Sequence, residues 1–193
     1  MQYARHLVAS VMNAISDTAD IVSTIEPIVQ QILLLKGKLI VTGMGKAGLV
    51  GQKVSATLRS TGQPSAFLDP AQALHGDMGM ISPDDGLLAY SNSGETTEVV
   101  AVARWCADFG VPVISITSRP DSPLQRLATA SISYPLVDEG CPIRRAPMAS
   151  CIQQMMIGDA IASELMGRRG FTEADFLVLH HGGYLGRVIA EGQ

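Results

Sequence analysis

Short β-rich runs alternate with helical stretches along most of this chain, and this alternation limits the possible fold more than any other feature. The expected strands cover residues 38–42, 64–68, 87–90, 113–117 and 130–136. Such alternation favours a parallel sheet with helices on both faces, whose ligands bind beyond the carboxyl ends of the strands. We therefore expect an α/β fold with a doubly wound, mostly five-stranded parallel sheet.

Residues 1–36 are expected to form a helical N-terminal arm. Apolar residues recur at helical spacing from Leu7 to Ile32, and Pro27 inside this run predicts two helices or one kinked helix. No repeat, linker or low-complexity tract interrupts the chain, so we expect one domain over residues 1–193.

Composition narrows the classes of partner. The net charge is −4 without a Lys/Arg cluster, so nucleic acid is not expected as a partner. No apolar run reaches the ~18 residues that a membrane span needs. The three cysteines are odd in number and widely spaced, which favours a reduced, cytoplasmic protein. A hydrophobic content of 47% favours some burial between subunits.

The loop after the third expected strand is rich in hydroxyl groups. Four of them lie where the strand gives way to a helix: Ser91, Ser93, Thr96 and Thr97. Backbone N–H groups at a helix start attract anions, most often phosphate. The loop therefore indicates phosphate binding. Glu95 and Glu98 in the same stretch do not help to hold phosphate; one can cap the helix, and one can have another role.

A glycine-rich turn follows the first expected strand. Residues 43–48 fit the pattern GxGxxG, and Asp69 ends the next strand as a ribose-binding acid would. Dinucleotide binding is therefore one interpretation, and close packing of helix on strand is the other. Lys46 in the first helical turn opposes the helix dipole, which suits a lysine that meets an anionic ligand; the alternative is a surface lysine.

Two histidine positions are candidates for proton transfer. His75 lies in a polar turn before Gly76, where it is either an acid–base group or a surface histidine. His180 and His181 precede two glycines. Neighbouring histidines rarely ligate one ion without further ligands, so no metal site is expected.

Taken together, these stretches resemble the sugar isomerase (SIS) domain family. The matching strings, in family order, are VTGMGKAGLVGQKVSATLRSTG, FLDPAQALHGDMGMI, SNSGETTE, RRAPMAS, GDAIA, RGFTEADF and HHGGYLG. The resemblance covers about residues 36–187 and is closest to D-arabinose 5-phosphate isomerases of the short type, which lack paired CBS modules. It favours a phosphosugar site over a dinucleotide site.

The resemblance implies a site for a small-molecule sugar phosphate, with no cofactor and no required metal. It implies that three hydroxyls hold the phosphate: Ser91, Ser93 and Thr96. It also implies four polar catalytic positions: Lys46, His75, Glu98 and His180. Gly45 and Asn92 are possible further contacts, and Glu95 would order the loop. We expect the catalytic positions at one edge of the sheet.

The implied reaction converts D-ribulose 5-phosphate to D-arabinose 5-phosphate through a cis-enediol. It needs one base and a group that stabilises the enediolate. Our hypothesis assigns Glu98 or His180 as the base and His75 as its helper. The family also implies a homo-oligomer, a dimer or a homotetramer, with each site bordered by a neighbouring subunit.

The chain departs from the family pattern around residues 144–152, which affects the sugar-binding end, and at His181. Residues 148–152 replace a run of Thr and Ser, Arg144 and Arg145 stand where a leucine is usual, and His181 replaces a proline. Alternatives are therefore an isomerase of another sugar phosphate and a non-catalytic phosphosugar sensor. The intact polar positions favour the enzyme.

Overall fold

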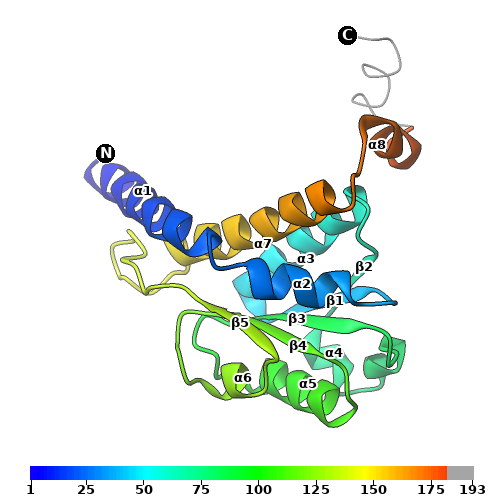
Figure 1. The fold of residues 1–193 in the computed structure, drawn as a ribbon. Helices are drawn as coiled ribbons and strands as arrows, with labels where there is room; N and C mark the ends of the chain where they lie inside the picture. Colours follow the sequence, from blue (N-terminus) through cyan, green and yellow to red (C-terminus); the bar gives the residue numbers. More distant parts are fainter. Residues whose placement is uncertain (182–193) are drawn as a thin grey trace.

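Five parallel strands form the centre of the fold in the computed structural model, which describes residues 1–181 (Figure 1). Their order in the sheet is β2-β1-β3-β4-β5. The strands are β1 (Leu39–Gly43), β2 (Ser65–Leu68), β3 (Gly86–Tyr90), β4 (Val113–Thr117) and β5 (Ala130–Ser133). The predicted parallel five-stranded sheet is confirmed, although β5 ends at Ser133 rather than at residue 136.

Helices cover both faces of the sheet, so its central strands are buried throughout. Against one face pack α2 (Glu26–Leu33), α3 (Gly45–Ser60) and α7 (Ala149–Arg168), with Val29, Val54 and Ile157 in the shared core. Against the other face pack α4 (Pro70–Ala73), α5 (Thr97–Asp108) and α6 (Pro123–Arg126). The 3₁₀ helix η1 (Asp77–Met80) lies between α4 and β3 in the sequence.

The N-terminal arm consists of two helices, which is one of the two outcomes that Pro27 predicted. Helix α1 (Gln2–Val22) ends before α2, and Pro27 lies in the first turn of α2, where a missing N–H costs nothing. Figure 1 shows α1 extending away from the sheet, in contact with α7. Large apolar side chains remain exposed on α1: Tyr3, Val8, Met12 and Ile15. Among residues 1–181, no helix combines the length and apolarity needed to cross a membrane.

Helix α7 runs from the carboxyl ends of the strands to their amino ends. It begins beside the loop after β3 and ends near α8 (Glu173–Leu179) (Figure 1). Leu179 shares a surface depression with Lys38, Pro64 and Ser65, which lie at the starts of β1 and β2. Because α7 has 20 residues and a helix rises ~1.5 Å per residue, its ends lie roughly 30 Å apart.

The strand order reverses direction at β1. The chain passes from β1 outward to β2 and then returns to β3 on the other side of β1. In open parallel sheets, the loops after the two strands at such a reversal diverge and leave a crevice at the carboxyl edge. The fold therefore places a binding crevice between the loops that follow β1 and β3.

Candidate active site

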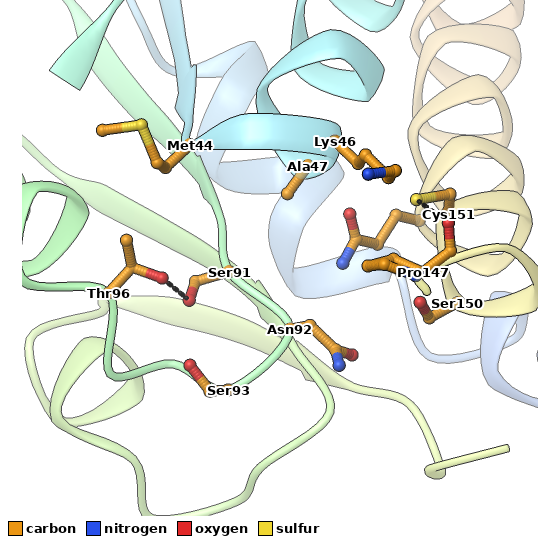
Figure 2. Close-up of a pocket in the computed structure, with 11 residues that line it drawn as sticks. Met44, Lys46, Ala47, Ser91, Asn92, Ser93, Thr96, Pro147, Ser150 and Cys151 are labelled. Atoms are coloured by element: carbon orange, nitrogen blue, oxygen red, sulfur yellow. Dashed lines mark hydrogen bonds between the residues drawn. The ribbon is translucent and has the colours of Figure 1, made fainter. Parts of the chain in front are cut away.

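A cavity of about 340 Å³ occupies this crevice (Figure 2). Its volume lies in the range of small-molecule sites. Three elements supply the lining: the start of α3 (Met44, Lys46, Ala47), the loop after β3 (Ser91, Asn92, Ser93, Thr96) and the start of α7 (Pro147, Ser150, Cys151, Gln154). The cavity therefore combines the two loops that the sequence singled out with a third wall.

The β1–α3 turn brings Lys46 to the cavity because its glycines allow a close approach. A Cβ at Gly48 would lie 2.4 Å from the Gly43 carbonyl oxygen, so helix and strand pack backbone against backbone. Gly45 has a φ of +61°, where glycine is favoured. Close packing thus accounts for the GxGxxG pattern. Lys46 extends from α3 toward Cys151 on α7 (Figure 2).

The hydroxyl loop, residues 91–96, forms the opposite wall. Ser91 Oγ and Thr96 Oγ1 lie 2.9 Å apart (Figure 2). The Gly94 N–H donates to Ser91 Oγ at 3.0 Å. The Glu95 N–H donates to Ser93 Oγ at 3.2 Å. Thr96 precedes α5, but within residues 1–181 its side chain makes no capping hydrogen bond to that helix. The N-terminal N–H groups of α5 are thus left for an anion.

The third wall is the N-terminus of α7, which is held by a carboxylate. Glu139 Oε2 accepts hydrogen bonds from the Met148 N–H at 2.7 Å and the Ser150 N–H at 3.1 Å. Burial and the Glu139 charge raise the pKa of the Cys151 thiol, although the nearby Lys46 lowers it. Cys151 therefore faces the cavity as a neutral thiol.

This third wall went largely unpredicted. The sequence marked residues 148–152 as a departure from the family pattern, but it gave no signal for Gln154 or for the cap by Glu139. Arg144 and Arg145, which stand where a leucine is usual in the family, are exposed and lie outside the lining formed by residues 1–181. Arg144 Nε instead lies 4.0 Å from Asp138 Oδ2.

Within residues 1–181, three further predicted residues are not among those that line the cavity. Gly45 stands between two lining residues, whereas the lining supplied by residues 1–181 does not include His75 or Glu98. His75 is exposed just after α4, following the carboxyl end of β2. Glu98 is half-buried in the first turn of α5. Both residues follow carboxyl ends of strands, as expected.

His180 does not share the edge of the sheet with Lys46 in one chain, contrary to expectation. It follows α8, its ring stacks on Phe176 with centroids 3.7 Å apart, and its Nδ1 lies 2.9 Å from the Phe176 carbonyl oxygen. Its neighbour Leu179 lines a surface depression together with Lys38, Pro64 and Ser65, at the starts of β1 and β2. The length of α7 separates this histidine from the cavity. Gly182 and Gly183 of the same motif lie outside the described residues.

Metal-binding side chains are not gathered in the part of the chain that the structure describes. Among residues 1–181, no three His, Cys, Asp or Glu side chains are arranged to hold a metal ion. All three cysteines are free thiols: Cys106, Cys141 and Cys151.

Comparison with known proteins agrees with the fold. The profile of the SIS domain family matches residues 32–164, which include all five strands and the three cavity walls. The chain belongs to the SIS domain family.

Other SIS domain proteins are similar over most of the chain. The arabinose 5-phosphate isomerase KdsD of Pseudomonas aeruginosa is 48% identical over 152 residues, which are 79% of this chain and 47% of that protein. KdsD of Escherichia coli K12 is 45% identical over 154 residues, 80% of this chain and 47% of that protein. This SIS domain chain thus spans about half the length of the curated relatives it matches.

A solved structure of the SIS fold is similar over nearly its whole length. The Escherichia coli CFT073 protein c3406, solved in complex with arabinose 5-phosphate, superposes with a TM-score of 0.87 at 32% identity. The match covers 92% of this chain and 95% of that one. A Bacteroides fragilis protein described as a phosphosugar isomerase involved in capsule formation matches with a TM-score of 0.79 at 36% identity, over 92% of this chain and 99% of that one.

Proposed function

We propose that this chain is an aldose–ketose isomerase that interconverts D-ribulose 5-phosphate and D-arabinose 5-phosphate. The observation that carries the proposal is the cavity between Lys46 and the hydroxyl loop, in a chain 48% identical to an arabinose 5-phosphate isomerase. The c3406 complex with arabinose 5-phosphate supports the same ligand class for a neighbour of the same fold.

In this proposal the phosphate binds at the hydroxyl loop. Ser91, Ser93 and Thr96 offer hydroxyl groups, and the uncapped start of α5 offers N–H groups and the positive end of its dipole. The sugar chain then extends across the cavity toward α7. Lys46 lies between the two walls and supplies positive charge for the phosphate or for a developing enediolate.

The chemistry moves protons between neighbouring carbons. A base removes a proton from C1 of the ketose while O2 gains a proton, which yields the cis-enediol. Return of a proton to C2 and loss of the O1 proton then yield the aldose. We assign Glu98 or His180 as the base and His75 as its helper, because carboxylates and imidazoles are suited to such transfers near neutral pH.

We infer that His180 serves the cavity of a neighbouring copy, because its own cavity lies at the other end of α7. A homo-oligomer, dimer or tetramer, then completes the site. The exposed apolar side chains of α1 support such an assembly. Three free cysteines and a net charge of −4 support a cytoplasmic protein that does not bind nucleic acid.

The first test is interconversion of a panel of ketose phosphates by purified protein. We expect aldose phosphate from D-ribulose 5-phosphate, and turnover reduced by about 100-fold or more in Glu98→Gln, His75→Ala and His180→Ala. If all three variants keep wild-type turnover, the assignment is wrong. Binding of a panel member without conversion of any member would make the chain a sensor.

The second test asks whether His180 acts between copies. We expect Lys46→Met and His180→Ala to be inactive alone. When the two are mixed and reassembled, random pairing restores an intact Lys46 and an intact neighbouring His180 in about a quarter of sites. Recovery of about a quarter of wild-type activity supports the shared site, and no recovery contradicts it.

A further inference from the structure

A buried chain of hydrogen bonds joins the hydroxyl loop to α7. Tyr134, just beyond β5, donates its hydroxyl hydrogen to Asn92 Oδ1 at 2.9 Å. The same hydroxyl oxygen accepts a hydrogen bond from Gln154 Nε2 at 2.5 Å. Gln154 is 1% exposed and Tyr134 is 2% exposed, whereas Asn92 and Gln154 both line the cavity. Two amides from opposite walls are thus linked through one phenol.

These two hydrogen bonds determine which amide atoms of Asn92 and Gln154 remain for a ligand. Burial raises the pKa of Tyr134 above its ordinary value, so the hydroxyl keeps its single hydrogen and can donate only once. The phenol therefore uses the oxygen of one amide and the NH₂ group of the other. One amide keeps a free oxygen and the other keeps free N–H groups. In the structure, Gln154 keeps the oxygen and Asn92 keeps the N–H groups.

Two buried oxygens beside the cavity have no partner among residues 1–181. They are Gln154 Oε1 and Ser150 Oγ, both on lining residues. A buried polar atom without a hydrogen bond loses its contact with water and gains nothing in return, so such atoms point to a missing partner. The hydroxyl of a sugar both donates and accepts, and therefore matches a cavity that offers an amide oxygen from Gln154 and amide N–H groups from Asn92.

We propose that Gln154, held in place by Tyr134, acts with Asn92 to recognise one hydroxyl group of the sugar chain. Gln154 and Asn92 are then specificity-determining residues, and Tyr134 is a positioning residue. The phosphate end is held separately by the hydroxyl loop. This inference rests on the proposed function to the extent that it takes a sugar phosphate as the ligand.

The test compares a ligand that has the sugar chain with one that lacks it. Calorimetry measures the affinity of each full-length variant for D-arabinose 5-phosphate and for inorganic phosphate. We expect Gln154→Met, of similar size, to weaken sugar phosphate binding about 10- to 100-fold and to leave phosphate binding unchanged. Unchanged affinity for the sugar phosphate, or an equal loss for both ligands, would overturn the proposal.

Gln153 provides a matched control. It is the preceding residue of α7, fully buried, and neither of its amide atoms has a partner within residues 1–181, but it lies outside the lining that these residues form. Gln153→Met should leave both affinities unchanged. A selective loss of sugar phosphate affinity in Gln153→Met as well would contradict a specific role for Gln154.

Tyr134→Phe tests the positioning role and decides the question if Gln154→Met does not fold. It should cause a smaller, still selective loss of sugar phosphate affinity. The double variant should bind no more weakly than Gln154→Met alone, because both changes act on one interaction. Additive losses, or losses shared with inorganic phosphate, would overturn the linkage.

Measuring both sugar phosphate affinity and isomerase activity distinguishes hydroxyl recognition from catalysis. A wild-type chain that binds the sugar phosphate through Gln154 but converts none of it contradicts only the isomerase activity. A chain that isomerises normally but shows no selective loss in Gln154→Met contradicts only the hydroxyl recognition.

Discussion

Gly94, in the middle of the hydroxyl loop, has a positive φ of 65°, which residues with side chains rarely adopt. A Cβ at this position would lie 2.2 Å from Ser122 Oγ and 3.0 Å from Thr117 Oγ1. The Gly94 N–H donates to Ser91 Oγ, and its carbonyl accepts from the Leu124 N–H at 3.0 Å. The loop is therefore packed against α6, and the positions of the hydroxyls that we propose to bind phosphate depend on this contact.

We expect Gly94→Ala to distort the loop. Unfolding free energy should fall by about 2–4 kcal/mol, from the left-handed backbone and the clash together. Affinity for inorganic phosphate should fall by about 10-fold or more, because the hydroxyls and the α5 N–H groups lose their alignment. Urea unfolding and calorimetry measure the two effects.

Gly110 separates backbone strain from the clash. It has a φ of +79°, and a Cβ there meets nothing within 4 Å. Gly110→Ala should cost only about 1–2 kcal/mol and leave phosphate binding intact. Equal effects of both substitutions on phosphate binding would show that the contact with Ser122 does not shape the loop.

Among the elements, α7 supplies the largest part of the site that could not be predicted from the sequence. Its N-cap residue, Met148, makes no side-chain cap in the described chain, and Glu139 from the preceding loop takes over that function. A carboxylate at a helix N-terminus satisfies N–H groups and favours the dipole. The cavity wall formed by Pro147, Ser150 and Cys151 therefore depends on a residue outside the helix.

We expect Glu139→Ala to fray the start of α7. Unfolding free energy should fall by about 1–2 kcal/mol, and amide hydrogen exchange in residues 149–153 should accelerate. Glu139→Gln keeps an acceptor and should recover part of the loss. The control is Glu164→Ala, which removes only an exposed pair with Arg168 and should cost less than about 0.5 kcal/mol. Unchanged exchange in Glu139→Ala would contradict the capping role.

The elements were predictable from sequence because strands and helices carry local patterns. The parallel sheet, the division of the N-terminal arm near Pro27 and the hydroxyl loop followed from runs of apolar residues and from turn residues. The placement of His180 did not, because it depends on the direction of α7 across the whole molecule. The hydrogen bonds that link Gln154, Tyr134 and Asn92 could not be predicted either. The three residues lie far apart in the sequence, and a glutamine in an apolar helix gives no signal.

At the scale of the whole molecule, the buried carboxylate of Asp85 links the segments that precede β1 and β3 at the amino edge of the sheet. Asp85 accepts hydrogen bonds of 2.8 Å from Lys38 Nζ, from the Lys38 N–H and from the Ser82 N–H. Its side chain is 1% exposed. Burial alone would raise the pKa of Asp85, but these hydrogen bonds outweigh it and lower the pKa.

The lowered pKa gives a pH dependence of stability. The folded pKa lies below the unfolded value of about 3.9, so Asp85 stabilises the fold above that pH, and the contribution is lost as the pH falls through the folded pKa. We expect Asp85→Asn to cost about 2–4 kcal/mol at pH 7. The difference from wild type should shrink below about pH 4.

Urea unfolding at several pH values measures this effect. Asp84→Asn is the matched control, because the neighbouring side chain is exposed, and it should change stability by less than about 0.5 kcal/mol at any pH. A gap between Asp85→Asn and wild type that stays constant from pH 7 to about 3 would rule out the carboxylate as the source of the pH dependence.

The position of Asp85, at the edge opposite the cavity, has a consequence for how such a chain can change over generations. The Asp85 contacts that hold the sheet and the residues that line the cavity lie at its two ends. Substitutions at the start of α7 can therefore accumulate without loss of the anchoring contacts. A library randomised at Met148, Cys151 and Gln154 should contain many folded members, and new substrate preferences can be selected among them.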